Sequence, residues 1–150
     1  MRDRRAWHKR EGVRAAALLA CLAAAGGACA PRLAPAPTVT TPAHPDYVYP
    51  EVPPVFTRPE LTLRLDRGWA FLQTGDPEAA RREFSAALAA NPGFHPAEAG
   101  IAYARLAEGD ADAAASAFDR ALARDPAYVP ALVGRGDALL ALDRPDEAAE

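Results

Sequence analysis

A pattern of residues recurs along this chain at a fixed spacing of 34 positions. The pair Gly75-Asp76 returns as Gly109-Asp110, and small, aromatic and proline residues return around it. The matching pairs are Ala80 with Ala114, Phe84 with Phe118, Leu88 with Leu122, Pro92 with Pro126 and Gly100 with Gly134. A fixed period of this length is typical of a supersecondary unit that stacks on copies of itself. It predicts stacked helical hairpins, a class of fold that generally binds other polypeptides.

Turn residues divide each unit into two helices. We expect a capping box formed by Thr57 and Glu60 to begin the first helix, with a proline in its first turn. Gly75 then ends this helix, and Asp76 caps the next one. The second helix runs to about residue 90, because the residue before Pro92 avoids the helical conformation. Each unit is therefore predicted to be a helix-turn-helix hairpin.

The recurring residues resemble the tetratricopeptide repeat (TPR) family. The resemblance implies an all-α fold, a right-handed superhelix of stacked hairpins, with repeats at residues 61–94 and 95–128 and an incomplete third repeat at residues 129–150. The residues that match the family's spaced positions are Gly68, Phe71, Gly75, Ala80, Phe84, Ala87 and Pro92 in the first repeat, Ala102, Gly109, Ala114, Phe118, Ala121 and Pro126 in the second, and Gly136, Leu139 and Ala148 in the third.

Some positions depart from the family pattern. The early tryptophan of the repeat is replaced by Arg64, Glu98 and Leu132, the usual aromatic by Arg105, and the third turn glycine by Asp143. The sequence given stops within the third hairpin, whereas stacked repeats generally need about three units. We therefore expect either a longer parent array or a last helix that frays.

The amino-terminal segment has the composition of an export signal. Residues 1–14 are basic and polar, residues 15–25 are an apolar run rich in Ala and Leu, and small residues follow up to Ala28. This order matches the three regions of a signal peptide, and the apolar run is shorter than the roughly 20 residues that a membrane span needs. We therefore interpret residues 1–28 as a signal peptide.

A cysteine directly after this segment resembles the lipid-attachment site of bacterial lipoproteins. Cys29 is the first candidate for lipidation and Cys21 the alternative; simple cleavage without a lipid remains a further possibility. The resemblance implies an exported protein on the periplasmic face of the cell envelope, held on the outer membrane because Ala30 rather than an aspartate follows Cys29. Several acyl chains together give stable anchoring.

Residues 29–59 form a proline-rich tether between the lipid-attachment site and the repeats. Proline favours extended polyproline II geometry over helix, so this segment is expected to act as a spacer. Its second half, residues 47–56, carries tyrosine, valine and phenylalanine side chains that a spacer does not require. These residues either dock onto the repeats of the same chain or remain solvated.

In the TPR family the first helices of successive hairpins line a peptide-binding groove. The matching positions here carry apolar and aromatic side chains in place of the Lys and Asn with which one class of the family holds a peptide carboxylate. The resemblance therefore implies an apolar groove with aromatic anchors, whose loss costs about 2 kcal/mol or more. The predicted groove residues are Leu65, Trp69, Leu72, Ala99, Tyr103, Leu106 and Leu140, with Val133 and Asp137 at the remaining positions.

Charge and motifs argue against other functions. Residues 29–150 carry 11 arginines and 18 acidic side chains, which is unfavourable for binding a nucleic acid. The three histidines are scattered, and no catalytic, metal-binding or phosphate-binding motif occurs. We therefore expect neither an enzyme nor a cofactor or metal site.

The sequence favours a membrane-anchored lipoprotein that serves as an adaptor or scaffold for another protein in the bacterial envelope. The alternative is a structural spacer, or a repeat protein that associates with itself and has no dedicated peptide ligand.

Overall fold

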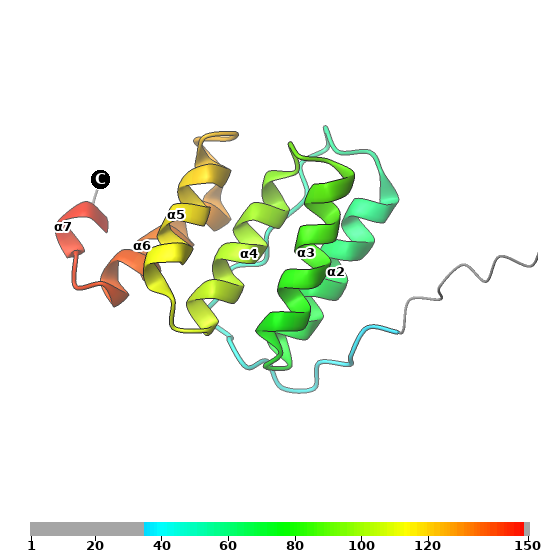
Figure 1. Cartoon of the computed structure of the whole chain (residues 1–150), viewed down its shortest axis with the longest axis horizontal. Coiled ribbons are helices and arrows are strands. Elements are labelled where there is room, and N and C mark those ends of the chain that lie inside the picture. The colour runs from blue at the N-terminus through cyan, green and yellow to red at the C-terminus, as the bar shows by residue number, and fades with distance from the viewer. Residues whose placement is uncertain (1–34, 149–150) are drawn as a thin grey trace, which may run out of the picture. The chain divides into compact units, whose positions relative to one another are not determined.

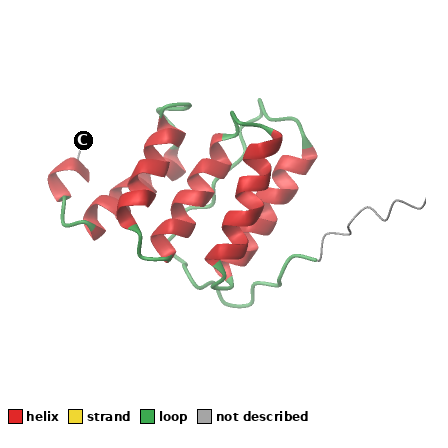
Figure 2. Cartoon of the chain, viewed as in Figure 1, coloured by secondary structure: helices red, strands yellow, loops and turns green. Residues whose placement is uncertain are grey.

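The computed structural model describes residues 35–148. The predicted signal peptide, including Cys21 and Cys29, and the first part of the tether lie outside the described residues. Within residues 35–148 the secondary structure is helical without strands (Figure 2). The helices are α2 (Pro59–Gln73), α3 (Pro77–Ala90), α4 (His95–Ala107), α5 (Ala111–Leu122), α6 (Val129–Ala141) and the short α7 (Pro145–Ala148). The predicted all-α class is confirmed.

The turns between paired helices follow from their glycine and aspartate residues. Gly75 and Gly109 have positive φ angles of 81° and 80°, a conformation that glycine adopts without steric cost. The next residue caps the following helix: the carboxylate of Asp76 accepts a hydrogen bond of 2.8 Å from the backbone N–H of Ala79. Asp110 forms the same bond in the second hairpin. Successive antiparallel hairpins are therefore set by local sequence (Figure 1).

The third turn has the same geometry without the glycine. Asp143 lies 34 positions after Gly109 and has a positive φ of 58°. Among the described residues, it is the one residue other than glycine that has a positive φ. The backbone N–H of Arg144 still closes the turn by donating to the carbonyl of Leu139 at 2.9 Å. The aspartate thus preserves the turn at a conformational cost that the two glycines avoid.

The beginning of α2 differs from the prediction. The residue at the N-cap is Arg58 rather than Thr57, and no side chain caps the helix, so the predicted capping box is wrong. The carboxylate of Glu60 instead pairs with the guanidinium of Arg58 at 2.7 Å. Proline does occupy the first turn, as predicted, where its missing N–H has no helical partner to lose.

Close approach of the hairpins depends on small residues opposite two phenylalanines. Phe84 is fully buried, and a Cβ added to Gly100 would lie 2.7 Å from its ring. Gly134 faces the ring of Phe118 in the same way one repeat later. A side chain at either glycine would push the next hairpin away, because packed cores leave no room for extra atoms. The 34-residue recurrence of these pairs is therefore a packing requirement.

Ion pairs occupy two of the three positions where the family pattern expects tryptophan. Arg64 pairs with Glu83 at 3.1 Å, and Glu98 pairs with Arg120 at 3.2 Å. The carboxylate of Glu83 also pairs with the buried guanidinium of Arg67 at 3.0 Å. Each pair joins the first helix of a hairpin to its second helix. These charged contacts replace the packing that an aromatic side chain would provide there.

Residues 43–56, which we call the strap, approach α2 as non-helical chain (cyan in Figure 1). At its start, the N–H of Ala43 donates to the carbonyl of Gln73, the last residue of α2. At its end, the ring of Phe56 contacts that of Phe94, just before α4 begins. The strap therefore runs antiparallel to the first helices of the hairpins, and it brings Tyr47 and Tyr49 onto their buried surface.

Candidate functional site

The predicted groove residues lie on α2, α4 and α6, the first helices of the three hairpins, and α4 contacts both of the others. Their burial differs along the series. Fully buried are Leu65, Leu72, Ala99 and Tyr103. Trp69 and Leu106 are partly buried, and Leu140 is 59 % exposed. The groove is thus covered over α2 and α4 and open at α6.

A chain of aromatic contacts joins the groove to the strap. The ring of Tyr103 lies 4.8 Å from that of Tyr47 and 5.9 Å from that of Trp69. The ring of Tyr49 meets Trp69 edge to face at 5.6 Å. Below them Tyr103 contacts Phe118 at 5.0 Å. Such pairs contribute about 0.5–1.5 kcal/mol each beyond the burial of their surface. Two strap tyrosines, two positions apart, therefore contact the two predicted aromatic anchors.

Gln73 binds the backbone of the strap. Its side-chain oxygen accepts from the N–H of His44 at 3.1 Å, and its side-chain N–H donates to the carbonyl of the same residue at 3.0 Å. This pairing satisfies both main-chain groups of one residue, so it does not depend on the side chain at that position. Gln73 was not among the predicted groove residues. Gln73 lies one helical turn after Trp69, and this position on the same face of α2 was the sequence signal that could have identified it.

A second backbone contact holds the other end of the strap. The hydroxyl of Tyr128, just before α6, donates a hydrogen bond of 2.8 Å to the carbonyl of Glu51. The ring of Tyr128 also packs against His95 at 4.7 Å, and His95 contacts Phe56 at 5.4 Å. Tyr128 was likewise not predicted, since its partner lies 77 positions away in the sequence.

Burial raises the pKa of one groove tyrosine, Tyr103, and of one strap tyrosine, Tyr49. It raises the pKa of the Tyr103 hydroxyl, against a hydrogen bond from the backbone of Val48 that lowers it. This hydroxyl donates to the carbonyl of Pro130 at 2.8 Å, which links α4 to the start of α6. Burial also raises the pKa of Tyr49, whose hydroxyl donates to Asp66 at 2.5 Å. These hydroxyls therefore remain hydrogen-bond donors.

Acidic side chains surround the strap. Burial, followed by the negative charge of Asp46, raises the pKa of the Asp137 carboxyl. Asp137 in turn raises the pKa of Tyr47, after the effect of burial. Asp66 and Glu51 act in the same direction on Tyr49. The face formed by strap and groove therefore carries a negative potential.

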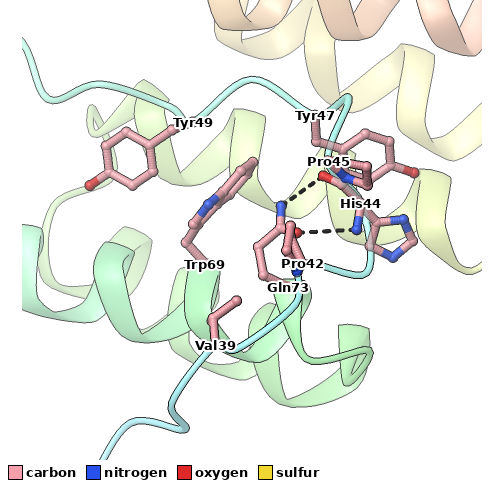
Figure 3. Close-up of a pocket in the computed structure, with 8 residues that line it drawn as sticks. All are labelled: Val39, Pro42, His44, Pro45, Tyr47, Tyr49, Trp69 and Gln73. Atoms are coloured by element: carbon pink, nitrogen blue, oxygen red, sulfur yellow. Dashed lines mark hydrogen bonds between the residues drawn. The ribbon is translucent and has the colours of Figure 1, made fainter.

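A cavity of about 390 Å³ lies between the strap, the residues before it and α2 (Figure 3). Figure 3 shows the Trp69 ring on its wall, with Tyr49 to one side and the Gln73–His44 hydrogen bonds to the other. Its lining residues are Val39, Pro42, His44, Pro45, Tyr47, Tyr49, Trp69 and Gln73.

Two further features were sought in the part of the chain that the structure describes, a metal cluster and a membrane-spanning helix. Residues 35–148 contain no group of three or more His, Cys, Asp or Glu residues placed to hold a metal ion. Among the same residues, no helix has both the length and the apolar character that crossing a membrane requires.

Stacked helical hairpins define an all-α repeat protein. Family models for the tetratricopeptide repeat match residues 65–102 and 105–150. The chain belongs to the tetratricopeptide repeat family, as the resemblance of its recurring residues implied. Repeats of this family are scaffolds for protein–protein interaction and are generally not enzymes. No curated protein matches the chain.

Proposed function

We propose that the protein is an adaptor that binds an extended segment of a partner protein in the groove along α2 and α4. The observation that carries this proposal is the pairing of Gln73 with both backbone groups of His44. A side-chain amide placed in this way recognises main-chain groups whatever the side chain they carry, and Tyr128 contacts the main chain further along through Glu51. Main-chain hydrogen bonds give affinity, and pockets for alternate side chains give specificity.

The aromatic contacts favour a particular ligand sequence. Tyr47 and Tyr49 reach Tyr103 and Trp69 from positions two apart, at and just after the turn of residues 44–47. A partner segment that carries two aromatic residues two positions apart can form the same contacts. We therefore propose an extended, aromatic and proline-containing segment as the ligand class.

The strap then acts as an internal competitor for the groove. Because it belongs to the same chain, its effective concentration reaches the millimolar range for a short flexible connection. A partner has to outcompete this local concentration, so affinity in the intact protein is lower than the affinity of the free groove. Self-docking of residues 47–56 thereby keeps the aromatic anchors covered until a partner is present.

Anchoring and location complete the proposal. We propose that Cys29, or alternatively Cys21, carries a lipid that holds the protein on the periplasmic face of the envelope, at the outer membrane. In this location the protein works as a non-enzymatic scaffold without a cofactor. Expression of Cys29→Ser and Cys21→Ser variants, followed by membrane fractionation, tests the anchor. Release of the Cys29→Ser protein alone supports the first site, and release of neither contradicts lipid anchoring at both.

The adaptor function is tested by binding of a labelled peptide with the sequence of residues 43–56. The protein is the full chain, either unchanged or with Tyr47→Ser and Tyr49→Ser, which loosen the strap but leave the groove intact. We expect the variant to bind the peptide at least about tenfold more tightly, because the internal competitor is weakened. Adding Trp69→Ala should abolish this gain. Equal, weak binding by all three proteins would contradict the proposal.

A second candidate function, self-association as a spacer, is favoured by exposed apolar side chains on α6. Val129, Leu132, Val133 and Leu140 are between 40 % and 60 % exposed. Such clustered exposure is typical of interaction surfaces. Light scattering separates the two functions: a stable dimer that is lost in Leu140→Gln, without any peptide affinity, supports the spacer.

A further inference from the structure

We propose that the cavity between the strap and α2 binds a cationic side chain, a guanidinium or ammonium group presented by a basic partner polypeptide. The cavity has walls from both the strap and α2, so it exists only while the strap is in place. It shares Trp69 with the groove, but it needs the strap in place, whereas peptide binding in the groove needs the strap removed. The inference does not rest on the proposed exchange of the strap for another segment.

The walls have the chemistry that a cation requires. Four aromatic rings line the cavity, and they stand at different angles to one another. Tyr49 and Trp69 are perpendicular at 5.6 Å, whereas His44 and Tyr47 are stacked at 4.6 Å. A guanidinium or ammonium within about 6 Å of a ring face is attracted by the negative potential of that face. Because Tyr47 is covered by His44 and Tyr103, the rings that remain for a cation are those of Trp69 and Tyr49.

Size and charge agree with this ligand. A cavity of about 390 Å³ has room for a long side chain such as that of arginine or lysine. None of its lining residues is an arginine, a lysine or a carboxylate. Burial lowers the pKa of His44, so this ring is neutral at pH 7 and does not repel a cation.

Acidic groups next to the cavity supply the long-range attraction. Asp46 directly follows Pro45 in the wall, and Asp66 accepts the hydroxyl hydrogen of Tyr49. Asp137 and Glu51 add to the negative potential felt by Tyr47 and Tyr49. Complementary charge of this kind speeds encounter and selects a partner of opposite sign.

A second copy of the chain is a poor occupant. Residues 29–150 carry 18 acidic side chains against 11 arginines, so the net charge of a second copy is unfavourable next to the acidic groups around this cavity. The inferred partner is therefore a different polypeptide with exposed arginine or lysine residues.

Fluorescence of Trp69 in the full chain tests this site. The chain has two tryptophans, so a Trp7→Phe background makes Trp69 the sole reporter. The probes are a blocked heptapeptide that alternates alanine with arginine and a matched peptide with neutral citrulline in place of each arginine. We expect the arginine peptide to change the Trp69 fluorescence in a saturable way. The citrulline peptide should bind at least about tenfold more weakly, because only arginine carries the charge. Equal affinity for the two peptides would overturn the proposal.

Two variants of the same wall distinguish the cavity from general attraction to an acidic surface. Tyr49→Phe keeps the ring and removes the hydroxyl, whereas Tyr49→Leu removes the ring. We expect the first to bind the arginine peptide like the parent and the second to bind about tenfold more weakly. Retained exchange protection of the His44 amide in Tyr49→Leu shows that the strap is still seated. Equal binding by both variants would contradict the aromatic site.

Discussion

Gln73 and His44 are joined by two hydrogen bonds, so one side-chain amide satisfies both main-chain groups of a residue that is 29 positions earlier in the chain. This contact fixes where the strap crosses the end of α2. It sets the register that carries Tyr47 and Tyr49 onto the aromatic anchors. The position of the strap therefore depends on a neutral polar residue within a largely apolar surface.

Replacement of Gln73 by methionine should loosen the strap. Methionine has a similar volume but forms neither hydrogen bond, and each lost bond costs about 0.5–1.5 kcal/mol. We expect the His44 amide to exchange with solvent faster and the melting temperature to fall. Thr74→Ala is the matched control, because the Thr74 hydroxyl bonds only within its own helix and is exposed. Unchanged exchange at His44 in Gln73→Met would contradict the role of this amide.

Alanine at two helical glycines should have opposite effects. Gly100→Ala places a methyl group 2.7 Å from Phe84, and such overpacking costs about 1–3 kcal/mol. Gly136→Ala meets nothing within 4 Å, so it should stabilise its helix by about 0.5–1 kcal/mol. Urea unfolding of the two variants measures both changes. Equal free energies of unfolding for both would show that the Phe84 contact does not limit the packing.

Glycine at position 143 should stabilise the third turn. Asp143 has a φ of 58°, a region that glycine enters at lower cost. We expect Asp143→Gly to raise the free energy of unfolding by less than the roughly 1–2 kcal/mol that a left-handed residue costs, and Gly75→Ala to lower it. Asp143→Asn, which tolerates the same region, should be close to neutral. A destabilised Asp143→Gly protein would indicate that the carboxylate itself holds the turn.

His95 should make stability depend on pH. Burial lowers its pKa below the ordinary 6.5, against the charge of Asp125 that raises it, with Arg124 lowering it further. The unfolded chain thus binds a proton that the folded protein resists. The free energy of unfolding is therefore not reduced by His95 above about pH 6.5. It decreases as the pH falls from there through the pKa of His95 in the folded protein. His95→Phe should reduce this loss between about pH 7 and 5. A pKa above 6.5 for His95, measured by NMR, would contradict this account.

The sequence predicted the hairpins well because their determinants are local. Glycine and aspartate at the turns, and the glycine and phenylalanine pairs, recur in register, so position alone reveals them. The start of α2 was predicted wrongly, because Arg58 rather than Thr57 occupies the N-cap and its guanidinium pairs with Glu60. At such an exposed helix end, several local arrangements have similar energies.

The candidate site was predicted only in part. The resemblance to the repeat family pointed to Trp69 and Tyr103, whose rings lie 5.9 Å apart, but their role in binding a partner remains a prediction. Gln73 and Tyr128 could not be found in the same way. Their partners lie on the strap, and the path of an irregular proline-containing segment depends on tertiary contacts rather than on periodicity.

Displacement of the strap by a peptide is the most direct test of the proposed adaptor function. Hydrogen exchange of the labelled full chain is measured with and without an unlabelled peptide of residues 43–56. The Ala43 and His44 amides report on the strap, since both donate to Gln73. The account predicts that saturating peptide removes their protection while the amides of α4 and α5 keep theirs. Peptide that binds without changing exchange at Ala43 and His44, or that does not bind, would contradict the groove as the shared site.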